Sequence, residues 1–178
     1  LKRAAAANPA LRPPDANPKF EALAPVLAGT LPVIVSVEKA KDIELALKFI
    51  KDEKLTAVLR GCAQGYKVAD KIKASGLPVI IDSLYQGPSE PEDGYDAAFR
   101  NVGELAKAGV PICFSSGEDP GAGKDITYHA AKAVAFGLDR DAAIRALTID
   151  PAKVFGVDGR LGSLEPGKDA DLFIAAGD

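Results

Sequence analysis

The sequence predicts an α/β fold made of four strand–helix units with a parallel sheet. Four short apolar runs recur along the 178 residues, and helical patterns separate them. Continuous apolar runs of this length suit strands buried on both faces. The alternation of strand and helix implies parallel connections. The predicted strands are residues 31–35, 56–60, 77–81 and 110–114.

Three of these runs contain a proline near their start, namely Pro32, Pro78 and Pro111. A proline is tolerated at the first position of a strand, where its missing N–H costs least. Apolar residues at helical spacing predict a helix after each strand. Gly76 and Gly109 stand where a glycine ends a helix before the next strand. The predicted helices cover residues 43–50, 68–72, 98–106 and 126–134.

Shorter helices flank the four units. Asn17 as a cap with Pro18 at the first helical position predicts a helix up to residue 28. Asp139 is predicted to cap a helix over residues 140–147. Asp150 and Pro151 are predicted to open a short helix that ends at Gly156. A turn and a terminal strand over residues 170–175 follow.

Composition excludes several classes of function. The net charge of −3 and the pI of about 5.3 argue against a nucleic-acid or anionic-membrane partner. The apolar runs are too short to span a bilayer, and no signal segment opens the chain. Two cysteines are too few for a disulfide scaffold, so we expect reduced thiols in a cytoplasmic protein. Methionine is absent, and we expect either a fragment or a short protein whose start residue was removed.

The candidate site lies at the carboxyl ends of the predicted strands, where parallel α/β folds gather their ligands. The residues at these ends are Ser36, Glu38, Gly61, Cys62, Asp82, Gly117, Glu118 and Asp119. The four carboxylates among them suit a hard cation, but their spacing is typical of any acidic loop. Acidic loop residues are therefore the preferred interpretation.

Three further motifs favour structural interpretations over functional ones. Cys62 as a nucleophile needs a positioned base, whereas His129, the single histidine, is predicted on a helix as a packing or solvated side chain. Residues 117–124 (GEDPGAGK) miss the phosphate-loop spacing by one residue, and Asp125 stands where that motif has Ser or Thr, which predicts a flexible loop. Residues 86–98 are predicted as an exposed loop rather than a lid.

Nearly all of the chain after about residue 18 resembles the second half of metal-dependent amidohydrolases, most of all imidazolonepropionase-like members. The resemblance is strongest in residues 130–137 (AAKAVAFG), 141–151 (DAAIRALTIDP) and 162–174 (GSLEPGKDADLFI), and it extends to residues 20–43, 57–80 and 102–116. It implies the last four βα units of a TIM-like (β/α)₈ barrel, or a rearranged open three-layer sheet. The implied division is a linker or N-terminal extension over 1–18, a half-barrel domain over 19–160 and the return strand of a truncated small β-domain over 161–178.

The resemblance also implies a chemistry that this chain lacks the residues to perform. The family hydrolyses amide and related C–N bonds with divalent metals that activate water and polarise the carbonyl. The family's histidines on the fifth and sixth barrel strands fall on Ser36 and Gly61, with Glu38 where some members carry a second histidine. The aspartate on the eighth strand falls on Gly117. We therefore expect no metal, no other cofactor and no catalysis by this chain alone.

Two alternatives to a non-catalytic domain stay open. In the first, the chain belongs to an active amidohydrolase whose metal site is supplied by another chain or a missing segment. In the second, it is a small-ligand or subunit-binding module. A half-barrel exposes two sheet edges and an apolar face, which predicts self-association, with two half-barrels completing one another. A small molecule is a possible further partner.

Overall fold

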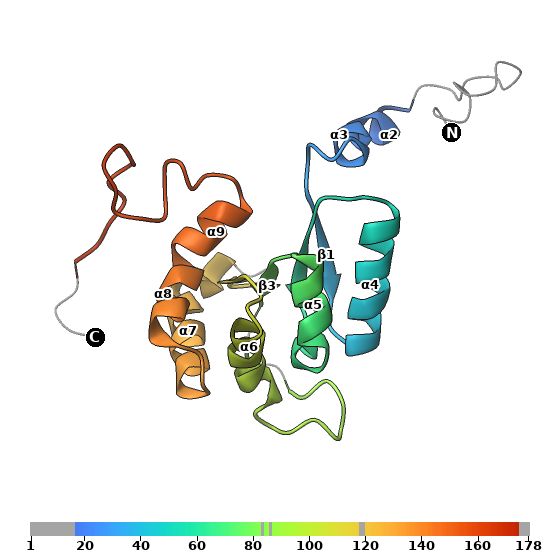
Figure 1. Ribbon diagram of the computed structural model, residues 1–178. Helices are drawn as coiled ribbons and strands as arrows, with labels where there is room; N and C mark the ends of the chain where they lie inside the picture. Colours follow the sequence, from blue (N-terminus) through green and yellow to red (C-terminus); the bar gives the residue numbers. More distant parts are fainter. Residues whose placement is uncertain (1–16, 83, 86, 118–119, 175–178) are drawn as a thin grey trace, which may run out of the picture.

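The computed structural model describes residues 17–82, 84–85, 87–117 and 120–174, and these contain a parallel sheet with the strand order β1-β2-β3-β4 (Figure 1). The strands are β1 (Val33–Val37), β2 (Ala57–Gly61), β3 (Val79–Ile81) and β4 (Ile112–Phe114). The four predicted strands are confirmed, and each begins one or two residues later than predicted. The carbonyls of Pro78 and Pro111 accept from the N–H groups of Leu59 and Val79, so each proline still joins the ladder through its oxygen.

Helices follow each strand, as predicted. The helices of the four units are α4 (Ala40–Asp52), α5 (Ala69–Ser75), α6 (Ala97–Lys107) and α7 (Ile126–Ala135). A 3₁₀ helix, η1 (Gly65–Val68), precedes α5. A second one, η2 (Pro120–Asp125), overlaps the flexible loop predicted over residues 117–124, so that prediction is wrong for residues 120–124, while residues 118 and 119 lie outside the described residues. Gly76 and Gly109 adopt positive φ angles of 71° and 80° after α5 and α6, as a glycine that ends a helix does.

The flanking helices also form, with small differences from the prediction. The helix expected up to residue 28 is divided into α2 (Pro18–Ala22) and α3 (Ala24–Leu27). Asn17 caps α2 by accepting from the Lys19 N–H at 3.0 Å. Asp139 caps α8 (Arg140–Leu147) by accepting from the Ala142 N–H at 2.9 Å. The last helix, α9 (Ile149–Val154), begins one residue before Asp150.

The main core lies between the sheet and the helices on one of its faces. Ile43, Leu59, Ile72, Val79 and Leu105 are fully buried there. On the opposite face, Val58, Ile80 and Cys113 form a small cluster with Val154 of α9. In Figure 1 the helix layer runs from α4 at one end to α7 and α8 at the other. The described residues therefore form the predicted parallel α/β sheet, with most of the helices on one face as in a partial barrel and α9 on the other face.

The segment after α9 forms turns without a strand. Arg160 and Asp169 close one turn through an ion pair of 2.6 Å and a backbone hydrogen bond from the Asp169 N–H to the Arg160 carbonyl. The strand predicted over residues 170–175 does not form in its described part, 170–174, because no neighbouring strand lies beside it. Of the helices in the described ranges, none combines the length and the apolar character that crossing a membrane requires.

Candidate functional site at the carboxyl ends of the strands

Two polar side chains stand next to one another on the open face, near the carboxyl ends of β1 and β2. Ser36 pairs in register with Arg60. Side chains alternate along a strand, so both lie on the face opposite the main core. The Arg60 Nε donates to both oxygens of Asp82, at 3.1 and 2.9 Å. Arg60 and Asp82 keep only 25% and 17% of their side-chain surface exposed, so this is a well-shielded pair.

Arg60 was missing from the predicted site residues, although its neighbours Gly61 and Cys62 were included. The signal that could have found it is a charge inside an otherwise apolar strand. A charged side chain in a buried strand needs a partner, and the strand-end carboxylate of Asp82 was a candidate. The sequence alone did not pair them because they are 22 residues apart.

The carboxylate of Glu38 lies over Gly61. A Cβ at position 61 would overlap Glu38 Oε1 and would lie 2.9 Å from Oε2. The Ala63 N–H donates to Oε2 at 3.0 Å. Loss of solvent around the carboxylate, together with the charge of Asp82, raises the pKa of Glu38, while the Ala63 N–H and Arg60 oppose that rise. Gly61 has a φ of 88°, which a residue with a side chain rarely adopts.

Cys62 is a structural residue of the turn that follows β2. Its side chain is fully buried and its φ is 54°. The Cys62 N–H donates to the Val37 carbonyl at 2.6 Å, which ties the turn to the end of β1. Burial, and then the charge of Glu38, raises the pKa of the thiol to about 12. A thiol of this kind is protonated at neutral pH, and the thiolate is the nucleophilic form.

A buried asparagine of α6 holds the same turn from the other side. Asn101 is 3% exposed. Its Oδ1 accepts from the Tyr66 N–H at 2.8 Å, and its Nδ2 donates to the Cys62 carbonyl at 2.9 Å. The backbone that follows β2 is thereby fixed to a helix on the core side of the sheet.

Asp93 fastens the long loop between β3 and α6 to the same region. It accepts from Gln64 Nε2 at 2.7 Å, from the Tyr66 hydroxyl at 2.8 Å and from Lys67 Nζ at 2.5 Å. The Lys67 ammonium, and then the Gln64 amide and the Tyr66 hydroxyl, hold the pKa of Asp93 well below its usual range. The prediction that residues 86–98 form an exposed loop is wrong for Asp93, whose side chain is 3% exposed.

Sequence reasoning missed the members of this network because none belongs to a motif. Gln64 also accepts from the Ala40 N–H at 3.1 Å, at the start of α4. The Gln64 N–H donates to the Glu38 carbonyl at 2.9 Å. The network therefore connects the loops that follow β1, β2 and β3, and it fixes the backbone on which Glu38 and Gly61 stand.

His129 is a packing residue, as one of the two interpretations of the sequence had it. It is 4% exposed, and its Nδ1 accepts from the Leu84 N–H at 3.2 Å. The Tyr85 ring covers it at 5.2 Å between centroids. The imidazole therefore helps to hold the backbone that follows β3.

The open face is hollowed beside Arg60. The hollow has a volume of about 400 Å³, and Ile34, Ile80, Cys113 and Phe155 are among the residues that line it. Gly117 also borders it, whereas Glu118 and Asp119 lie outside the described residues. Within the described part of the chain, no three His, Cys, Asp or Glu side chains gather closely enough to hold a metal ion.

Known proteins match both the sequence and the fold. The model of the amidohydrolase family matches residues 91–178. An N-acetylglucosamine-6-phosphate deacetylase of Haemophilus influenzae is 32% identical over 113 residues, which are 61% of this chain and 28% of that protein. An adenine deaminase of Desulforamulus reducens is 45% identical over 49 residues, which are 28% of this chain and 8% of that protein.

A crystal structure of an amidohydrolase from Thermotoga maritima superposes with a TM-score of 0.80 and 26% identity, over 96% of this chain and 44% of that one. The crystal structure of an uncharacterized protein, 16% identical, shares the fold with a TM-score of 0.62. The chain thus spans less than half the length of these relatives. Sequence and structure agree nevertheless, and the chain belongs to the amidohydrolase superfamily.

Proposed function

We propose that this chain is an amidohydrolase-family domain without the metal site, and that it does not catalyse hydrolysis by itself. The observation that carries the proposal is the carboxylate of Glu38 over Gly61. By the family resemblance, position 61 is where the sixth barrel strand presents a histidine to the metal. A Cβ at this position would overlap Glu38 Oε1, and the φ of 88° at Gly61 disfavours any residue with a side chain, so this conformation presents no ligand side chain from position 61.

Among the residues that the structure describes at this edge, the remaining donors do not fit a catalytic divalent metal. Ser36 offers a neutral hydroxyl, which is a poor zinc ligand. Glu38 already accepts from the Ala63 N–H, and Asp82 is held by the Arg60 guanidinium. Arginine stays positively charged at any physiological pH, and its charge beside Asp82 repels a divalent cation. We therefore derive no reaction step through a metal.

Metal binding by the purified 178-residue chain tests this proposal. After incubation with zinc and removal of the excess, we expect far less than one zinc per chain by plasma mass spectrometry. A panel of amide substrates should show no hydrolysis that a chelator abolishes. Stoichiometric zinc together with chelator-sensitive hydrolysis would contradict the proposal. It would favour an active enzyme whose metal site another chain or segment completes.

Arg60→Ala tests whether the positive charge of Arg60 keeps a divalent cation away from Asp82. Removal of the guanidinium frees Asp82 and takes a positive charge away from the edge, so we expect zinc affinity to rise roughly tenfold or more. Arg100→Ala is the matched control, because Arg100 also pairs through Nε with an aspartate, Asp96, at 2.9 Å. An equal response of the two variants would show that the Arg60–Asp82 pair is not what keeps a cation out.

A small-ligand role for the hollow and a cytoplasmic location stay predictions. The hollow offers an apolar floor, with Ile80 and Cys113, beside the polar groups of Arg60, Ser115 and Ser116. Such a combination of apolar wall and few polar groups is typical of small-molecule pockets.

A further inference from the structure

Both edges of the sheet are unpaired within the described residues, and one of its faces is largely bare. β1 pairs with β2 and β4 pairs with β3, so each keeps one open side. On the face opposite the main helices, Ile34 of β1 and Phe155 beside α9 line the hollow and stay 53% and 59% exposed. An unpaired strand edge beside exposed apolar side chains is a template for another strand.

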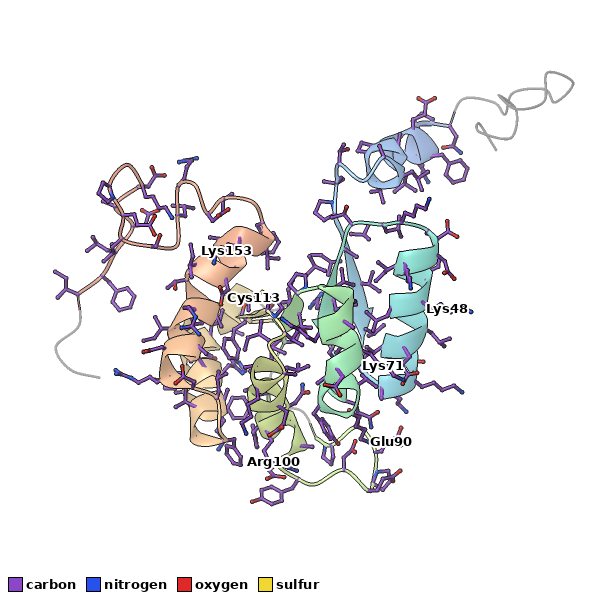
Figure 2. All side chains as sticks on the ribbon, viewed as in Figure 1. Lys48, Lys71, Glu90, Arg100, Cys113 and Lys153 are labelled. Atoms are coloured by element: carbon purple, nitrogen blue, oxygen red, sulfur yellow. The ribbon has the colours of Figure 1, made fainter. Side chains whose placement is uncertain are left out.

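The helix next to the β1 edge also presents apolar side chains to its outer side. Glu44 of α4 pairs with Lys71 of α5 at 2.7 Å, which identifies the side of α4 that faces α5 (Figure 2). Leu45 and Phe49 are 59% and 56% exposed. They lie one helical turn apart, and each is rotated about 100–140° around the helix axis from Glu44. Leu45 and Phe49 therefore point away from α5, on the side of α4 that lies toward the open edge of β1.

The opposite end of the helix layer carries a matching feature. Ile144 of α8 is 50% exposed, and α8 lies at the far end of the layer from α4 (Figure 1). The helices at both ends of the layer therefore expose apolar side chains. Exposed apolar surface is unfavourable in water, and where it is contiguous it marks an interaction site.

We propose that two copies of this chain associate about a two-fold axis parallel to the strands. β4 of each copy then pairs in parallel with β1 of the other, and the eight strands close into a barrel. A two-fold rotation about such an axis keeps all strands parallel and brings the last strand of one copy beside the first strand of the other. Eight parallel strands are the number that closes a TIM barrel.

The number of strands and the exposed apolar area both favour a second copy of the chain as the partner. The described sheet has four strands, so a second copy brings the number to the eight of a closed barrel. Ile34, Leu45, Phe49, Ile144 and Phe155 together expose on the order of 600 Å², since a large aromatic side chain buries about 150–250 Å². Each partner in a standard interface contributes about 800 Å². The strand edges and the bare face supply the rest.

The hollow beside Arg60 is incomplete without the partner. Closure places the open faces of the two copies opposite one another, and the two hollows become one enclosed lumen. The Arg60–Asp82 pair of each copy then faces this lumen. The barrel interior of the assembly is thus built from two identical halves. The partner therefore contributes residues to the hollow beside Arg60 as well as to the contact between the copies.

The oligomeric state of the 178-residue chain tests the proposal. Light scattering coupled to gel filtration and sedimentation velocity, from low micromolar to several hundred micromolar, should give twice the 18.5 kDa mass of one chain. Phe49→Glu should raise the dissociation constant roughly tenfold or more, since it desolvates a charge at the interface. Tyr95→Glu is the matched control, because Tyr95 is an aromatic side chain that is 83% exposed in the loop before α6.

Three outcomes would overturn the proposal. The first is a mass of one chain at every concentration. The second is a mass that keeps growing with concentration, because a contact that does not close builds open-ended assemblies. The third is an equal loss of dimer in Phe49→Glu and Tyr95→Glu. Leu45→Glu serves as a second interface variant, and unchanged far-ultraviolet circular dichroism identifies the variants that still fold.

Discussion

At the scale of the residue, burial lowers the reactivity of the two cysteine thiols of this chain. Cys62 and Cys113 are 0% and 1% exposed. Burial raises the pKa of Cys113 to about 11, with a smaller contribution from the charge of Asp150, and the pKa of Cys62 reaches about 12. Both thiols are therefore protonated in the folded protein at physiological pH. Neither is suited to nucleophilic attack or to metal ligation, which both require the thiolate.

We expect both thiols to resist Ellman's reagent at pH 8 in the folded protein and to react rapidly in guanidinium chloride. Because folding raises each thiol pKa above the ordinary value of 9.0, this contribution to stability is fully present below pH 9. It is lost as the pH rises through the folded pKa values. Ser115→Cys at the half-buried end of β4 is the reactive control. Labelling of the native thiols at the rate seen in denaturant would contradict the burial described here.

At the scale of the element, the carboxyl ends of the strands depend on side chains from distant loops and helices. Asn101 of α6 holds the turn after β2 through two hydrogen bonds to the backbone, and Asp93 joins three donors from the same turn. These contacts fix the conformation in which Gly61 and Cys62 adopt positive φ angles. Hydrogen bonds from distant elements therefore hold the strand ends, although the loops around them are long.

Asn101→Ala should lower the free energy of unfolding by about 2–4 kcal/mol, because it leaves the Tyr66 N–H and the Cys62 carbonyl without their partner in a buried place. Urea denaturation followed by circular dichroism measures this change. Glu104→Ala on the same helix is the control, since its side chain is 49% exposed and such substitutions usually stay within about 0.5 kcal/mol. Equal midpoints for the two variants would show that Asn101 does not support the turn.

At the scale of the whole molecule, the helices bury one face of the four-stranded sheet. Within the described residues both edges of the sheet are unpaired, and a small cluster with Val154 covers part of the other face. A parallel sheet is normally covered on both faces. The proposed two-fold closure supplies that cover, and it makes folding stability and association one equilibrium.

The melting temperature should therefore rise with chain concentration, because a partner that binds only the folded state stabilises it by mass action. Differential scanning calorimetry over a hundredfold range of concentration measures the rise. In Phe49→Glu the melting temperature should change less with chain concentration, whereas in Tyr95→Glu it should rise as in the unmodified chain. A melting temperature that is independent of concentration for the unmodified chain would speak against a dimer coupled to folding.

The sequence by itself determined the elements and their order. The apolar runs, the proline before three of them, the caps at Asn17 and Asp139 and the glycines after α5 and α6 are local signals, because each depends on residues within a turn or two. The same dependence on local signals explains the two wrong predictions of secondary structure. Residues 170–174 form a strand only if another strand lies beside them, and the 3₁₀ helix over residues 120–125 depends on packing against the rest of the fold.

Only the tertiary structure decided what the strand ends do. The sequence placed Ser36, Glu38, Gly61, Cys62 and Asp82 at one edge, but it did not bring the carboxylate of Glu38 over Gly61 or join Asp82 to Arg60. These contacts link residues more than 20 positions apart. Long-range pairing is set by how the strands align and how the turns bend, which no local pattern encodes. The residues alone show what stands at the positions that the resemblance assigns to ligands, whereas only the fold shows that the Glu38 carboxylate lies over Gly61.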